Sequence, residues 1–528
     1  MNNINIPYQQ TGYFSKLIID YLDGNEKLKP FYNQNCDIES FATIIEQRKQ
    51  FPINRTILVD VLTQQYKDVD ISEATKSSIQ HLNNSNCFTV TTGHQLNLFT
   101  GPLYFIYKII TTINLAKELK VKYQDNDFVP VYWMATEDHD FEEINHFNLF
   151  KKRYELAKTQ TGAVGKMKLD GVEELMLEIK KELGDRNETN EILEIFSNYY
   201  LSEKTFTSAI KGIVNQLFGK YGLVIIDGDD ALLKQLFMPE FKSELLERKN
   251  HQLINSTSEK LKKLGYKPQV SPREINIFYL KDNLRERIVF EENKYKVMNT
   301  TIEFSENEIL EELTSHPERF SPNAPMRCLY QEKVLPNLAY IGGGGELAYW
   351  LQLKELFNSN NISFPTLVLR NSVLFIDKAS NTKLQKLTIE PTELFQDTET
   401  LIKNQLKKCS TTALDLKIEE QLVAAVFEGI TKKAGAIDQS LQPFVAAELQ
   451  KSIKAIKNIE TRLIKAEKKK HEDAINQIMN IKEKLFPSNG LQERHDNIIS
   501  LLLYDRTIID ELIEKLPPLK KEFVILLE

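Results

Sequence analysis

Four short apolar runs, each followed at once by polar residues, constrain the fold of this chain more than any other feature. They lie at residues 88–91, 128–134, 223–226 and 366–369. Between the first two, residues 102–119 carry apolar side chains at helical spacing, behind a proline suited to a first turn. Apolar strands joined by a helix are typical of a parallel sheet that is covered on both faces. The pattern therefore predicts an α/β fold whose ligands lie beyond the carboxyl ends of the strands.

A second feature is the stretch at residues 444–486, which contains neither glycine nor proline. As one helix it would be about 65 Å long at ~1.5 Å per residue. Leu449, Ile453 and Ile456 begin a heptad-like spacing, which predicts a coiled coil that packs on shorter helices at 399–409 and 414–433. The alternative is a long helix that folds over its own domain.

The chain has 528 residues, more than one hydrophobic core usually organises. Helical and strand-like segments alternate between residues 151 and 322, and we interpret them as insertions into the sheet domain. The predicted division is 1–155 for the first part of the core, 156–319 for the insertions and part of the core, 320–387 for the last part of the core, and 388–528 for a helical coiled-coil domain.

Composition narrows the class of protein. The sequence has 67 basic and 74 acidic residues, a formal net charge of −7, which argues against a nucleic-acid-binding protein. The four cysteines are scattered, so neither a disulfide framework nor a cysteine zinc site is indicated. No signal-peptide pattern opens the chain, and no apolar run approaches the roughly 20 residues of a membrane span. We expect a cytoplasmic protein without nucleic-acid or membrane partners.

The first apolar run ends in the turn Thr92-Gly93-His94-Gln95. Nearby glycines allow close approach of the backbone, and the amides that open the following helix favour an anion. His94 can donate a hydrogen bond or act as an acid or base. Thr92, His94 and Gln95 are therefore candidate site residues, against the alternative that a histidine beside glycine is structural.

The second apolar run ends in Glu137-Asp138-His139-Asp140. Ionisable groups at the end of a buried strand are costly unless paired, so the cluster predicts a cationic partner: an ammonium group, a metal or an arginine of the protein. We favour substrate binding and acid–base chemistry by these four residues. A metal is the alternative, although the spacing fits no closed zinc site. A solvated loop is less favoured because of the preceding apolar run.

Four glycines, Gly342 to Gly345, precede Glu346 and a predicted amphipathic helix. The backbone amides of such a loop can hold a carboxylate or a phosphate. The loop has neither the lysine of a Walker motif nor the dinucleotide fingerprint, and a flexible turn is the alternative. The candidate residues here are Gly343, Gly344 and Glu346, with Arg327 and Arg370 as cations for a carboxylate.

A further motif, at residues 487–494, follows the long Gly- and Pro-free segment and opens another helix. Asn489-Gly490 is a turn signal, and Gln492 and Arg494 have donors for a phosphate at a helix start. An ordinary loop between two helices is an equally good interpretation. The candidate cofactor-binding residues are Gly490, Leu491, Gln492 and Arg494.

Together these motifs resemble the BshC family, the cysteine-adding ligases of bacillithiol biosynthesis. The matching segments follow the family order over nearly the whole chain: 92–104, 132–140, 284–287, 321–324, 335–354 and 487–494. The resemblance implies a Rossmann-like core related to class I synthetases, two connecting insertions and a C-terminal coiled coil that forms a homodimer. It also implies addition of L-cysteine to the amine of glucosaminyl-malate, with a nucleotide (ATP or ADP) at Gly490 to Arg494. The His-x-Gly-His and Lys-Met-Ser-Lys-Ser signatures of adenylating synthetases are absent from the sequence, so the way in which the cysteine carboxylate is activated stays open.

Joining cysteine to an amine requires a deprotonated amine and an activated carboxylate. Glu137, Asp138 and Asp140 would orient the amine and accept its proton. The glycine loop with Arg327 or Arg370 would hold malate or a carboxylate oxygen. Two rival interpretations are a nucleotidyl- or sugar-nucleotide transferase on the same core, and a coiled-coil scaffold whose core is inactive. Isotope exchange with and without cysteine separates the ligase from the transferase, and the retained charged cluster and glycine loop argue against the scaffold.

Overall fold

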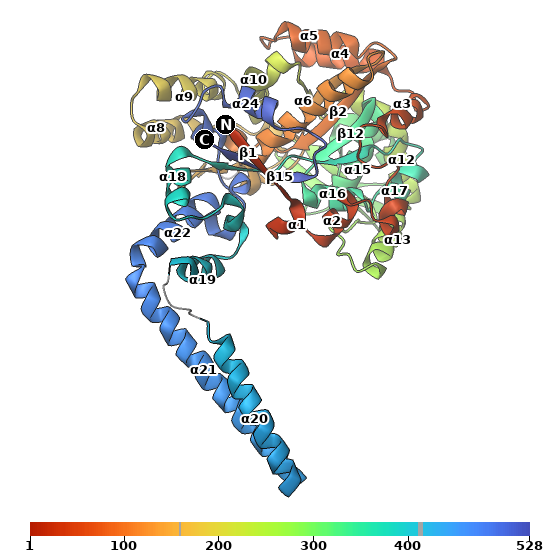
Figure 1. The fold of residues 1–528 in the computed structure, drawn as a ribbon. Helices are drawn as coiled ribbons and strands as arrows, with labels where there is room; N and C mark the ends of the chain where they lie inside the picture. Colours follow the sequence, from red (N-terminus) through yellow and green to blue (C-terminus); the bar gives the residue numbers. More distant parts are fainter. Residues whose placement is uncertain (158–159, 410–414) are drawn as a thin grey trace. The chain divides into compact units, whose positions relative to one another are not determined.

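The computed structural model describes residues 1–157, 160–409 and 415–528 (Figure 1). The chain divides into two compact units. The larger consists of residues 7–373 and 493–524, and the smaller of residues 1–6, 374–492 and 525–528. Each unit is described separately below.

A five-stranded parallel sheet forms the centre of the larger unit, as the apolar runs predict. Its strand order is β13-β12-β2-β3-β6, with every neighbouring pair parallel. The bounds are β2 (Cys87–His94), β3 (Asp127–Met134), β6 (Val224–Asp227), β12 (Asn337–Gly342) and β13 (Thr366–Leu369). In this register His94 lies opposite Met134, and Thr92 lies opposite Ile341. The polar residues that follow the strands are therefore brought to one edge of the sheet.

The helix predicted between the first two strands is α6 (Tyr104–Lys122), which packs against both β2 and β3. Its buried residues share one apolar cluster with α3 (Phe41–Lys49) and with the strands. Because the strands are apolar on both faces, they bury side chains under helices on either side. The cluster includes Phe41, Ile44, Phe88, Val90, Leu115, Leu119, Leu338 and Ile341.

The insertions contribute helices and a second sheet. The helices α8 (Val172–Leu183), α9 (Asn187–Tyr200) and α10 (Phe206–Phe218) precede β6. After β6, an antiparallel sheet has the order β10-β9-β8-β7-β11. Its strands are β7 (Ile277–Lys281), β8 (Leu284–Glu291), β9 (Lys294–Val297), β10 (Glu303–Phe304) and β11 (Phe320–Pro322). The chain then forms α15 (Ala324–Val334) and α16 (Gly344–Trp350) beside the core strands.

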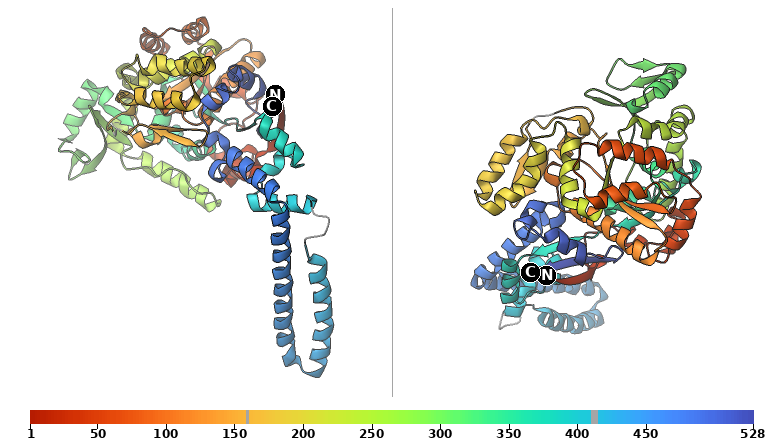
Figure 2. Two further views of the ribbon diagram at one scale, coloured as in Figure 1. Left: turned by 90° about the vertical axis from the view of Figure 1, so that its left-hand side faces the viewer. Right: turned by 90° about the horizontal axis from the view of Figure 1, so that it is seen from above.

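A short sheet has the strand order β1-β15-β14. Its strands are β1 (Asn2–Pro7), β14 (Val373–Ile376) and β15 (Glu522–Leu527), of which residues 1–6, 374–376 and 525–527 belong to the smaller unit. Helices α18 (Lys378–Lys386) and α19 (Thr398–Cys409) of the smaller unit follow β14. A helical arm consists of α20 (Lys417–Ile437) and α21 (Gln442–Lys470), which lie side by side (Figures 1 and 2). The coiled-coil domain expected from the spacing of Leu449, Ile453 and Ile456 is present. These residues lie on α21, and the helix that packs against α21 within the chain is α20. The expected start of that partner at Leu414 lies outside the described residues.

The prediction of one continuous helix over residues 444–486 is wrong. The segment forms α21 and a separate α22 (Glu472–Leu485), which meet at the non-helical residue His471. Three lysines occupy the last turn of α21, and Glu472 and Asp473 occupy the first turn of α22. Basic residues stabilise a helix C-terminus and acidic residues an N-terminus, so this charge reversal favours a helix boundary without glycine or proline. Among the described residues, none of the helices combines the length and apolar composition needed to cross a membrane.

Candidate active site

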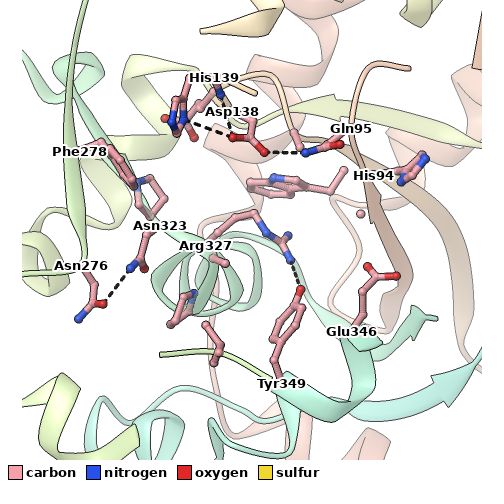
Figure 3. Close-up of a pocket in the computed structure, with 18 of the residues that line it drawn as sticks. His94, Gln95, Asp138, His139, Asn276, Phe278, Asn323, Arg327, Glu346 and Tyr349 are labelled. Atoms are coloured by element: carbon pink, nitrogen blue, oxygen red, sulfur yellow. Dashed lines mark hydrogen bonds and ion pairs between the residues drawn. The ribbon is translucent and has the colours of Figure 1, made fainter. Parts of the chain in front are cut away.

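A cavity of about 780 Å³ opens at the carboxyl edge of the parallel sheet, within the larger unit. Residues after β2 and β3 form one side, and residues of α15, α16 and β12 form another. The antiparallel insertion sheet supplies further lining residues, including Phe278, Arg285 and Arg287. In Figure 3, Gln95, Asp138 and His139 lie along one side, facing Arg327, Tyr349 and Glu346.

Both oxygens of the Asp138 carboxylate are hydrogen-bonded at the cavity. Its Oδ2 accepts a hydrogen bond from Gln95 Nε2 at 2.8 Å, and its Oδ1 accepts one from the backbone amide of His139 at 2.8 Å. Arg285 lies 3.5 Å from Oδ1. Burial by itself would raise the pKa of Asp138, but the contacts with His139, Arg285 and Gln95 outweigh it and lower that pKa below its usual range. Asp138 is therefore ionised at neutral pH.

His139 is held by the insertion sheet. Its Nδ1 lies 2.7 Å from Arg285 Nη1, and the guanidinium stacks 4.0 Å from the ring of Phe278. A guanidinium can only donate, so Nδ1 must accept and the ring must carry its proton on Nε2. With Nδ1 so occupied, Nε2–H is the remaining hydrogen-bond donor of the His139 ring.

Glu137 lies over a buried cation. Lys234 Nζ is 2.7 Å from Glu137 Oε1 and 2.7 Å from Asp229, and the lysine side chain is fully buried. Burial alone would lower the pKa of Lys234, but attraction by the two carboxylates raises it, so the lysine is an ammonium. Asp140 does not line the cavity. It caps the four-residue helix α7 (Phe141–Ile144) by accepting from the amide of Glu143.

The glycine loop is occupied by a side chain of its own helix. Glu346 Oε2 accepts from the amide of Gly343 at 2.9 Å, and Oε1 accepts from Tyr340 at 2.8 Å. Lys108, which is 1% exposed, pairs with the same carboxylate at 2.8 Å and donates to the carbonyl of Gly93. Glu346 lines the cavity, whereas Gly343 and Gly344 do not. The anion that the loop holds here is therefore a carboxylate of the protein.

The two arginines and the histidine that the sequence predicts for the site have different surroundings. Arg327 lines the cavity and donates to Gln331 and Tyr349, with no carboxylate of the described residues at ion-pair distance. Arg370 is buried in an ion pair with Glu493 at 2.7 Å and does not line the cavity. His94 lines it beside Tyr104 and Phe105. Burial, and then the charges of Lys108 and Arg370, lower the pKa of His94, which leaves its ring neutral.

Thr92 is an internal residue of the sheet: its hydroxyl donates to the carbonyl of Ile341, and it lies outside the cavity lining. Of the twelve predicted residues, the cavity thus brings together His94, Gln95, Glu137, Asp138, His139, Arg327 and Glu346.

Sequence reasoning missed several lining residues. Lys108 stands among apolar residues of a predicted buried helix, and that position was the available signal. Arg285 and Arg287 belong to a segment that contributed only to the family resemblance. Asn323 and Tyr349 also lie in segments of the resemblance, but nothing in those segments marked them as lining residues, since the packing of α15 and α16 brings them to the cavity.

The segment Gly490 to Arg494 is divided between the two units. In the smaller unit, the Gln492 side chain is committed to the backbone of Phe375, donating to its carbonyl and accepting from its amide. In the larger unit, Arg494 is exposed and has no ion-pair partner among the described residues. Of the candidate nucleotide ligands, only Arg494 therefore has side-chain donors available to a phosphate, so the segment alone does not fit a nucleotide. The described residues contain no group of three His, Cys, Asp or Glu side chains suited to a metal.

A parallel-sheet core with a charged cavity at its carboxyl edge, covered by insertions, defines an enzyme of the Rossmann-like class. Family models match the whole chain. Residues 1–371 match the N-terminal Rossmann-like domain of bacillithiol biosynthesis BshC, and residues 373–528 match its C-terminal coiled-coil domain. The chain belongs to the BshC family.

Three relatives show how similar these chains are. A protein of Flavobacterium johnsoniae is 46% identical over 99% of both chains. One of Cytophaga hutchinsonii is 41% identical over 97% of this chain and 96% of its own. One of Bacillus cereus is 29% identical over 94% and 95%. Each is named "Putative cysteine ligase BshC".

Proposed function

We propose that this chain is a ligase that joins L-cysteine to the amine of glucosaminyl-malate, the last step of bacillithiol biosynthesis. Family membership supports the reaction class. The observation that carries the proposal is the division of charge in the cavity: ionised Asp138 on one side and Arg327, unpaired by any described carboxylate, on the other. A substrate with an ammonium group and carboxylates matches both sides.

The side of the cavity formed by Asp138 and His139 is suited to orient the substrate amine rather than to deprotonate it. Asp138 stays ionised because its pKa is low, which suits it to hold an ammonium group but makes it a weak base. His139 can donate only through Nε2. His94 is buried and neutral, and its Nε2 has no hydrogen-bond partner among the described residues, so that nitrogen is free to accept a hydrogen bond from the substrate. Its lowered pKa makes it, like Asp138, a weak base.

The cationic side of the cavity suits the malate part of the substrate. Arg273, Arg287 and Arg327 line the cavity, and none has a carboxylate of the described residues at ion-pair distance. Guanidinium groups bind carboxylates through paired hydrogen bonds, each contributing about 1.5–3 kcal/mol. Lys108 is less available because Glu346 already neutralises it.

Mass spectrometry of product from glucosaminyl-malate, cysteine and nucleotide tests the reaction. Asp138→Ala should abolish the thiol product, whereas Glu142→Ala, an exposed carboxylate four residues further on, should not. His139→Ala should also lose activity. Wild-type turnover by Asp138→Ala and His139→Ala at saturating substrate would remove this cluster from the mechanism. Nucleotide exchange without cysteine would favour the transferase.

A homodimer through the arm is the proposed assembly. Ile418, Leu422, Val426 and Ile430 follow each other at four-residue spacing on α20, and all are exposed, by 42–68%. Such a stripe suits packing against a second copy. Light scattering should show a dimer that Leu422→Glu with Val426→Glu dissociates. A monomeric wild type at micromolar concentration would contradict this assembly.

The cytoplasm is the proposed compartment, to be checked by cell fractionation. A nucleotide, ATP or ADP, is the proposed cofactor, with Arg494 as the residue that contributes charge to it. Calorimetry with ATP and ADP tests whether the chain binds either.

A further inference from the structure

A line of hydrogen bonds runs from the cavity arginine into the buried core. Arg327 and Gln331 stand one turn apart on α15, and Arg327 Nη1 donates to Gln331 Oε1 at 3.1 Å. Gln331 Nε2 donates in turn to Glu332 Oε1 at 2.8 Å. From the other side, Asn337 Nδ2 donates to the same oxygen at 2.7 Å, and Thr91 donates to Asn337 Oδ1 at 2.8 Å. Gln331, Glu332, Asn337 and Thr91 are all buried.

The chemistry of the two ends fixes the direction of this line. A guanidinium only donates, and Glu332 Oε1 already accepts from Asn337 Nδ2, so the Gln331 amide must turn its oxygen to Arg327 and its nitrogen to Glu332. Rotating the amide would place donor against donor at one end and acceptor against acceptor at the other. Gln331 is therefore a fixed acceptor for Arg327.

The second feature of this line of hydrogen bonds is the buried carboxyl group of Glu332. Glu332 is 1% exposed, and burial raises its pKa to about 7 in spite of the hydrogen bonds from Asn337 and Gln331 and the charges of Arg48 and Arg327. Near neutral pH the group is therefore only partly ionised, and the neutral Gln331 keeps it from direct contact with Arg327. Arg370 shows the contrast, because it pairs directly with Glu493 and takes no part in the cavity.

We propose that Gln331 and Glu332 are positioning residues that hold the Arg327 guanidinium in place and unpaired, so that it binds a carboxylate of the ligand. The identity of that ligand rests on the proposed function. Gln331 acts as the neutral spacer, and Glu332 orients Gln331 without occupying the guanidinium.

Calorimetric titration with glucosaminyl-malate and with its dimethyl ester tests this role. The ratio of the two dissociation constants reports recognition of the carboxylates and cancels losses that affect both ligands alike. The wild type should prefer the free acid by about ten-fold or more, as expected for charge-assisted hydrogen bonds. Gln331→Met and Glu332→Leu should lose most of that preference. Glu332→Gln should keep it, because its amide oxygen still accepts from Gln331.

Lys333→Met is the matched control. Lys333 is on the same helix and pairs with Glu240, away from Arg327, so this change should lower stability without altering the ratio. The inference is overturned if Gln331→Met keeps the preference to within about two-fold of the wild type, or if Lys333→Met loses it as strongly. If Glu332→Leu does not fold, the ratios measured for Gln331→Met and Glu332→Gln still test whether Gln331 and Glu332 position Arg327. A wild type that binds neither ligand would count against the proposed function instead.

Discussion

The Lys108–Glu346 pair links the stability of the larger unit to its cavity. Lys108 is 1% exposed, and the Glu346 side chain is 27% exposed. Removing one partner of a buried pair costs about 3–5 kcal/mol when the remaining charge has no other compensation. The two single substitutions should therefore have unequal effects, because the two charges are not equally well compensated.

Glu346→Gln leaves a fully buried ammonium with the Gly93 carbonyl and a neutral amide, and we expect a loss of about 3 kcal/mol, at the lower end of that range. Lys108→Met leaves a carboxylate that still accepts from Tyr340 and Gly343 and is partly hydrated, so about 2 kcal/mol is expected. The double variant should also lose about 2 kcal/mol, because no unpaired charge remains, which gives a coupling of about 3 kcal/mol.

Urea unfolding followed by tryptophan fluorescence measures these losses. Trp133 and Trp350 are the only tryptophans of the chain, and both are buried in the larger unit, so the signal reports that unit and not the helical arm. The shift of the midpoint multiplied by the slope gives the change in free energy of unfolding. Single variants that lose less than about 1 kcal/mol, or a double variant equal to the sum of the singles, would refute the reasoning.

Three further predictions follow from buried groups and from the separation of the ligand sites. Because burial raises the pKa of Glu332 to about 7, the unfolded chain releases this proton at lower pH than the folded chain does. The free energy of unfolding should therefore fall by about 3 kcal/mol between roughly pH 4.5 and pH 7. Urea unfolding at several pH values across this range should show that Glu332→Gln removes this fall. Gly228→Ala would place its Cβ 2.4 Å from the ring of Trp133, so a loss of about 1–3 kcal/mol and an altered tryptophan spectrum are expected; an unchanged midpoint would contradict this contact. Arg494→Ala should weaken nucleotide binding in calorimetry and leave glucosaminyl-malate affinity nearly unchanged, and Asp138→Ala should do the reverse; equal losses of both ligands would indicate one shared site.

The candidate site was predictable where charge follows a buried strand. Glu137, Asp138 and His139 stood out because ionisable groups at such a position need partners, and the structure supplies Lys234, Arg285 and Gln95. Gln95 was itself predicted from its turn, whereas Lys234 and Arg285 come from distant parts of the chain and show no local signal. For the same reason the sequence could not separate Arg327, which lines the cavity, from Arg370, whose charge Glu493 neutralises 123 residues away.

The fold divides in a similar way. The hydrophobic pattern alone determined four of the five strands of the parallel sheet, the helix between the first two strands and the coiled-coil arm, because continuous apolar strands and heptad-like spacing are local properties. Tertiary structure alone decided the strand order β13-β12-β2-β3-β6, the use of α20 as the partner of α21 and the filling of the glycine loop by Glu346. At His471 the sequence changes from lysines to acidic residues, which favours a helix boundary there. The absence of glycine and proline from the segment does not exclude such a boundary. Strand pairing, register and the burial of charged groups depend on which segments pack against each other. The sequence pattern shows which face of a segment is apolar, but not which other segment covers that face.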